Sequence, residues 1–189
     1  PWLASGQIYN YEVVRGSKSL GNMDVIRHHD SNVETVKIKS EVEFRILFSF
    51  EVIYSLNERF VNGVLVEGSG FNTLNGSYQK QTEISRSGNS YTLEIDGVKS
   101  NVQVDSIRYS VSRIYFEEPY DGQRVYSQTF GKWMTFEKVG ESTYKMVSPD
   151  GDNFYTYTNG VCVEVKVERD YAGFSFIMKP ESLARVKNK

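Results

Sequence analysis

Few residues in this chain have the types and spacing that chemistry would need. The two histidines, His28 and His29, are adjacent, and Cys162 is the only cysteine. Neighbours on a strand point to opposite faces, so the two rings are poorly placed to share one metal ion. Cys162 precedes Glu164 in a strand pattern, and a nearby carboxylate disfavours the reactive thiolate. We therefore expect no metal site, and we expect the cysteine to be a packing residue.

The serines and carboxylates form no motif that specifies a catalytic site. There is no Gly-x-Ser-x-Gly elbow and no glycine-rich phosphate loop. The stretch 150–153 (Asp-Gly-Asp-Asn) begins like a calcium loop but lacks the later ligands, and a hairpin turn explains it. A carboxylate pair for glycoside hydrolysis must lie about 5–10 Å apart, which spacing along the chain does not specify. We assign no catalytic residue and no cofactor, and keep a carboxylate-dependent hydrolase as an alternative function.

The composition narrows the class of protein. The 189 residues include 22 basic and 24 acidic side chains, for a net charge of −2, which disfavours binding to nucleic acid. The apolar runs are too short for a transmembrane helix. Aromatic residues make up 14% of the chain. Such rings either form cross-strand pairs or line a ligand cavity on a concave sheet.

The turns indicate antiparallel β-structure. Six of the 15 glycines follow Asn or Asp, a dipeptide that favours tight hairpins. They occur at Asn62-Gly63, Asn75-Gly76, Asp96-Gly97, Asp121-Gly122, Asp150-Gly151 and Asn159-Gly160. The loop at 96–97 predicts the pairs Ile95–Val98, Leu93–Ser100 and Tyr91–Val102. The loop at 159–160 predicts Phe154–Val165 and Tyr157–Cys162.

The longest alternating pattern runs from Val36 to Tyr54, where every even position except Ser40 is apolar. One straight strand of that length would span roughly 60 Å, far beyond the usual strand. Either the strand bends across a strongly curved sheet, or it breaks near 45–49 into two strands with matching faces. In both cases one continuous apolar face covers a common core.

Two further segments carry specific expectations. Residues 105–116 place Ile107, Val111 and Ile114 at helical spacing, so they form either a short helix on the sheet or a strand. Residues 181–189 are basic with little apolar content and are expected to be a solvated tail. The domain is then 1–180. The fold class is all-β and mainly antiparallel: a strongly curved single sheet, or a half-open barrel of roughly 10–12 strands, with one short helix.

Several phrases resemble a known kind of protein. Residues 9–13 (Tyr-Asn-Tyr-Glu-Val) precede Gly16 and Leu20-Gly21, residues 105–107 lead to 114–116, and 148–151 precede 159–161. These phrases are similar to uncharacterised exported bacterial β-domains, which more remotely resemble the half-barrel lipoprotein carriers of the periplasm. The resemblance implies a curved antiparallel sheet and a place in the cell envelope, and implies no catalytic residue. The start at Pro1 fits a removed leader segment or a fragment.

These observations predict a non-catalytic protein of the periplasm or cell envelope, which binds an apolar or lipid-like ligand on the concave face of its sheet. A module that docks a protein or a glycan is the other alternative. The residues expected near the ligand are aromatic: Phe44, Phe48, Phe50, Tyr54, Tyr115 and Trp133.

Overall fold

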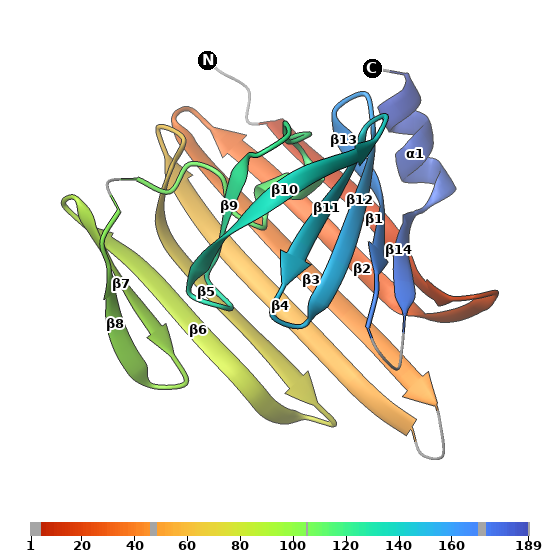
Figure 1. Ribbon diagram of the computed structural model, residues 1–189, viewed down its shortest axis with the longest axis horizontal. Helices are drawn as coiled ribbons and strands as arrows, with labels where there is room; N and C mark the ends of the chain where they lie inside the picture. Colours follow the sequence, from red (N-terminus) through yellow and green to blue (C-terminus); the bar gives the residue numbers. More distant parts are fainter. Residues whose placement is uncertain (1–4, 46–48, 105, 170–172, 189) are drawn as a thin grey trace.

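The computed structural model describes residues 5–45, 49–104, 106–169 and 173–188, which form one large antiparallel sheet (Figure 1). The first half of the chain supplies eight strands in sequence: β1 Ser5–Arg15, β2 Lys18–Asp30, β3 Val33–Arg45, β4 Ser49–Val61, β5 Val64–Leu74, β6 Ser77–Ser87, β7 Ser90–Ile95 and β8 Val98–Val102. The second half supplies six: β9 Arg124–Ser127, β10 Lys132–Gly140, β11 Thr143–Ser148, β12 Gly151–Thr158, β13 Val161–Val167 and β14 Phe174–Met178.

The strand order explains how one sheet encloses a core. It runs from β8 back to β1, then from β14 back to β9, so the two halves join where β1 pairs with β14. The strands β9 to β13 lie in front of the first half (Figure 1). The main buried cluster combines Val36 and Leu56 of one half with Tyr126 and Val161 of the other. The expected curved, open antiparallel sheet is confirmed, but the described residues form 14 strands, more than the expected 10–12.

The long alternating pattern resolves into two strands. β3 ends at Arg45, β4 begins at Ser49, and Phe44 pairs with Phe50 across the break. The even positions of both strands face the concave side, where Val36, Ile38 and Leu56 are buried. The second alternative from the sequence is therefore correct, because a break with matching parity keeps one apolar face on the core.

The hairpin registers were predicted well where no bulge intervenes. All three expected pairs flanking the turn at 96–97 are present. Across the turn at 159–160 Tyr157 pairs with Cys162 as expected, but Phe154 pairs with Lys166. A register shift between Thr156 and Tyr157 moves the remaining pairs by one residue, so the predicted pair of Phe154 with Val165 is wrong.

The helical segments differ from expectation. Of residues 105–116, only Arg113–Tyr115 are helical, as one 3₁₀ turn, and position 105 lies outside the described residues. Where a solvated tail was expected from residue 181 onward, the chain forms the helix α1, Pro180–Lys187. Pro180 suits the first helical turn, Val186 is fully buried and Ser182 bonds to the backbone of Asn10. No helix in the described chain is long and apolar enough to cross a membrane.

Candidate functional site

Two of the six expected aromatic residues lie together at the adjoining ends of β3 and β4. Phe44 and Phe50 pair across β3 and β4, and both are half-buried. Phe48 lies outside the described residues. The ring of Phe44 is 5.8 Å from that of Phe174, which is 5.4 Å from Phe176. We call Phe44, Phe50, Phe174 and Phe176 the rim cluster.

The rim cluster has a firm apolar base. Phe44, Phe174 and Phe176 pack against the buried side chains of Val13, Leu20 and Val42. The ends of β3 to β6 beside this region extend beyond β9 to β12 (Figure 1). The buried side chains therefore support the aromatic rings from one side, and part of each ring stays accessible because all four residues are only half-buried.

The other three expected residues are half-buried and lie away from this pair. Tyr54, Tyr115 and Trp133 pack against the main core cluster. Burial raises the pKa of Tyr54 to about 12 and that of Tyr115 well above its ordinary value. Trp133 lies edge-on to Tyr126, with 5.3 Å between ring centres. The five described residues therefore divide by location into a pair at the adjoining ends of β3 and β4, and a group packed against the main core.

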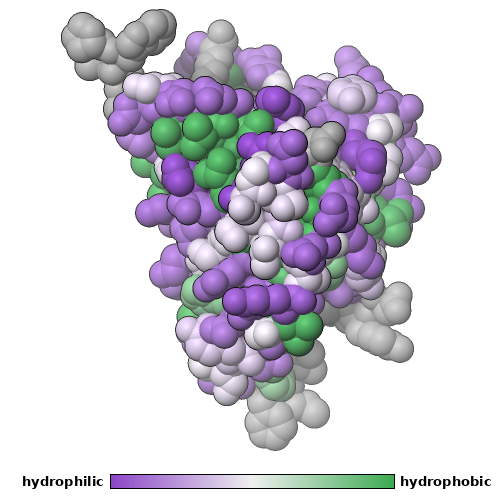
Figure 2. Space-filling model, turned by 90° about the vertical axis from the view of Figure 1, so that its left-hand side faces the viewer, coloured by the Kyte–Doolittle hydropathy of each residue, from purple (hydrophilic) through white to green (hydrophobic). Residues whose placement is uncertain are grey.

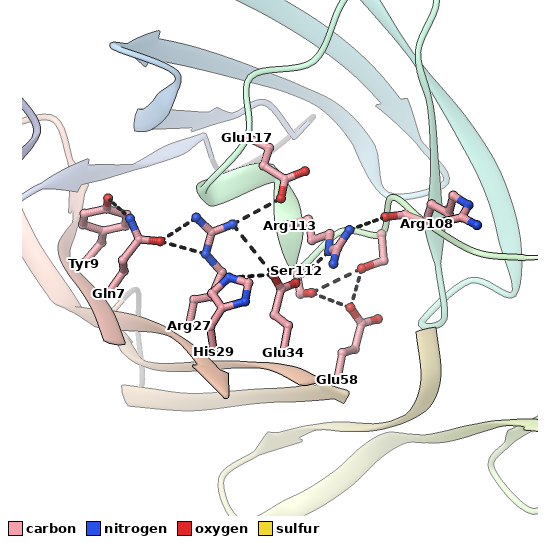
Figure 3. Close-up of polar contacts among 11 residues, drawn as sticks. Gln7, Tyr9, Arg27, His29, Glu34, Glu58, Arg108, Ser112, Arg113 and Glu117 are labelled. Carbon is pink, nitrogen blue, oxygen red and sulfur yellow. Dashed lines mark hydrogen bonds and ion pairs between the residues drawn. The ribbon is translucent and has the colours of Figure 1, made fainter. Parts of the chain in front are cut away.

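A network of charged side chains crosses the core, and sequence analysis did not single it out (Figure 3). Its centre is Glu34 on β3, which is only 5% exposed. Glu34 accepts a hydrogen bond from Nε of Arg113 at 2.8 Å, and its other oxygen is 3.0 Å from Nε2 of His29. Arg27 lies 4.0 Å from Glu34 and 3.2 Å from Glu117. These contacts attach the segment around Arg113 to β2 and β3.

A second buried carboxylate, Glu58 on β4, binds the same segment. The hydroxyls of Ser110 and Ser112 both donate to its Oε2 atom, while its Oε1 atom has no partner among the described residues. Glu58 is 3% exposed. Burial is the largest influence on this group and raises its pKa, although the two serines and Arg113 act in the opposite direction.

Glycines make room for a polar side chain beside Glu58. Gln128 is fully buried and donates from Nε2 to the hydroxyl of Thr82 at 3.1 Å. It lies against Gly68 and Gly70 of β5, where an added Cβ would be 2.4 Å and 3.2 Å from its amide atoms. Here the glycines are required by the close approach of a side chain to the sheet.

Glu34 and Glu58 are the two neighbouring carboxylates, one of them with a perturbed pKa, that a hydrolase would need. The segment that carries Ser110, Ser112 and Arg113 covers both groups. A substrate could reach them only if this segment moved away. No group of three or more His, Cys, Asp or Glu in the described chain is arranged to hold a metal ion. The geometry therefore favours a structural role for the carboxylate pair.

The pH dependence of stability provides a test of this role. Because the pKa of Glu58 is raised on folding, the stability that it contributes is present below its unfolded pKa and is lost as pH rises through the folded pKa. We expect Glu58→Gln to match the wild type near about pH 4 and to be the more stable protein at about pH 8. Urea unfolding at both pH values measures the difference. A constant difference between the two proteins would contradict the buried charge.

We call Glu34, Glu58 and the side chains that bind them the polar centre. The sequence pattern contained a clue to the positions of its two carboxylates. Glu34 and Glu58 continue the even-numbered, inward-facing pattern of Val36–Tyr54 at its two ends, so an inward direction could have been extrapolated. Their partners Ser110, Ser112 and Arg113 are more than 50 residues away from Glu58 or Glu34 along the chain. Nothing in the spacing of those partners identifies the contact.

Comparison with known proteins agrees with the fold and leaves the activity open. The chain is similar to a β-barrel-like protein of a domain of unknown function, DUF1849, from Brucella abortus, with a TM-score of 0.57 and 8% identity over 92% of this chain and 94% of that one. This similarity concerns the fold alone. No curated protein matches. The model of a family described as a domain of unknown function (DUF6134) matches residues 11–181, and the chain therefore belongs to that family.

Proposed function

We propose that this protein is a non-catalytic binding protein of the bacterial cell envelope, which holds an apolar, acyl-chain-like ligand at the open end of its concave face. The observation that carries the proposal is the rim cluster. Its four phenylalanines are half-buried, and Phe44 and Phe50 belong to the adjoining ends of β3 and β4, which extend beyond β9 to β12 (Figure 1). A contiguous aromatic surface in such a position fits an apolar ligand.

The side chains of the rim cluster favour an apolar ligand. Phenylalanine offers no hydrogen-bonding group, so removal of its exposed surface from water is the main source of affinity, at about 25 cal/mol per Å². The buried base of Val13, Leu20 and Val42 holds the rings in place before a ligand arrives. A preformed surface reduces the ordering that binding would otherwise require.

The interior aromatic residues have a different part in this proposal. Tyr54, Tyr115 and Trp133 pack within the core, where they support the curved sheet on which the rim cluster lies. The ligand contacts are then Phe44 and Phe50 from the first half of the chain, with Phe174 and Phe176 from the second.

Titration with cis-parinaric acid, whose fluorescence rises in apolar surroundings, tests the proposal. We expect saturable binding to the wild type. Phe50→Ser is expected to weaken it by about tenfold or more, because it removes a contact ring without opening the buried base. The control is Ile8→Ser on the outer face of β1, where the side chain is 50% exposed. Absence of saturable binding, or equal weakening by both variants, would refute the proposed site.

The location in the envelope follows from the sequence resemblance and has its own test. We expect the product of the complete gene to fractionate with the periplasm or with envelope membranes, and to be protected from added protease in intact cells. Recovery in the cytoplasmic fraction alone would refute the envelope role and would leave the ligand site unaffected.

A further inference from the structure

A separate groove lies on the outer face of the sheet, away from the rim cluster. It has a volume of about 530 Å³ and extends across β3 to β8. Such a volume is in the range of small-molecule sites, which is about 300–1,000 Å³. On the side of the molecule that carries β6 to β8, hydrophilic residues surround a smaller apolar patch (Figure 2). Most residues that line the groove are charged or polar, so its ligand must differ chemically from a ligand of the rim.

The groove is lined by one regular row of cross-strand neighbours. Lys37 of β3 pairs with Asn57, Asn57 with Ser69, Ser69 with Glu83, and Glu83 with Glu94. All five residues line the groove. Strands lie about 4.8 Å apart, so the row places Lys37 about 14 Å from Glu83.

The charges of this row are poorly compensated within the protein. Glu83 and Glu94 are directly opposite each other, an arrangement of like charges that destabilises a sheet. Lys99 lies 3.6 Å from Glu94. Among the described residues Glu83 has no ion-pair or hydrogen-bond partner, and neither does Lys37 at the other end. The groove therefore offers one free carboxylate and one free ammonium, with neutral hydrogen-bonding side chains between them.

We propose that the outer groove binds a short, extended zwitterionic ligand, namely a peptide of about four residues with free termini. Its amino group lies between Glu83 and Glu94, where it relieves their repulsion, and its carboxylate meets Lys37. Asn57 and Ser69 donate and accept hydrogen bonds along the peptide backbone. The spacing decides the length, because an extended chain advances about 3.3–3.6 Å per residue and four residues span the row.

Calorimetric titration with tetra-alanine tests this site. The free peptide is expected to bind, and both N-acetyl tetra-alanine and tetra-alanine amide are expected to bind at least about tenfold more weakly, since each loses one charged contact. Glu83→Gln and Lys37→Met should show comparable losses with the free peptide. The matched controls are Glu137→Gln on β10 and Lys39→Met on β3, which lie outside the groove and should bind normally.

A second measurement separates binding from folding. Glu83→Gln is expected to raise the Tm of the unliganded protein by about 1–3 °C, because it removes the opposed charges. Weakened peptide binding by a variant that is more stable cannot come from unfolding. If free and capped peptides bind equally, or if none binds while Glu83→Gln still raises Tm, the proposal is wrong and the glutamate pair is a feature of the sheet alone. Neither result affects the rim-cluster proposal, because that site lies elsewhere on the sheet.

Discussion

Arg113→Met is expected to lower the free energy of unfolding by about 3–5 kcal/mol, because it leaves the buried carboxylate of Glu34 without its closest cation. In the wild type the guanidinium of Arg113 lies 2.8 Å from Glu34 and 4.1 Å from the ring centre of Phe60, and it donates to the carbonyl of Arg108. After the loss of this cation, Arg27 at 4.0 Å is the nearest arginine to the buried Glu34 carboxylate, and the segment that covers Glu58 loses its link to β3.

A matched pair on the surface provides the control for this effect. Arg59 and Glu67 are 2.6 Å apart on β4 and β5, with both side chains substantially exposed. Arg59→Met is expected to cost less than about 1 kcal/mol. The double variant Glu34→Gln with Arg113→Met should recover part of the lost stability, because no buried charge remains unpaired. Urea unfolding of all variants measures these differences. Equal losses of unfolding free energy for Arg113→Met and Arg59→Met would contradict the claim that Arg113 compensates a buried charge.

Gly68→Ala is the second substitution with a large expected effect. The new methyl group would lie 2.4 Å from Oε1 of Gln128, 3.0 Å from Ile84 and 3.2 Å from Glu58. Such crowding costs about 1–3 kcal/mol, because the neighbours must leave their packed positions. Thermal and urea unfolding of the purified variant measure the loss.

A double-variant cycle identifies the cause of that loss. In a Gln128→Ala background the space beside Gly68 is vacant, so Gly68→Ala should be much less harmful there than in the wild type. Gly6→Ala on β1 is the control, because its nearest contacts would be at 3.9 Å. If Gly68→Ala costs the same in both backgrounds, the close approach of Gln128 does not explain the glycine.

The sheet could be predicted from the sequence because its signals are local. Alternation over Val36–Tyr54 and the Asp96-Gly97 turn each specify a face or a register within a few residues. The bulge between Thr156 and Tyr157 was missed, since an inserted residue leaves the alternation on each side intact. The helix α1 was missed because its few apolar residues pack on distant strands rather than forming an obvious pattern.

The polar centre could not be predicted for a different reason. Residues 105–116 have helical spacing, yet Ser110, Ser112 and Arg113 direct their hydrogen bonds to Glu58 and Glu34 on other strands. These tertiary contacts override the local preference for a helix. Only part of the rim cluster could be predicted. Phe44 and Phe50 belong to one alternating pattern, whereas Phe174 and Phe176 come from the other half of the chain, and no local pattern connects the two pairs.

Photo-crosslinking with a diazirine-bearing fatty acid tests the proposed function most directly. After irradiation, mass spectrometry of proteolytic fragments locates the labelled side chains. The rim-cluster site predicts that the label is concentrated on Phe44, Phe50, Phe174 or Phe176, and that excess palmitic acid prevents it. Labelling chiefly on the outer face near Ile8 and Ile26, which are 50% and 38% exposed, or labelling that excess palmitic acid does not reduce, would contradict binding at the concave rim.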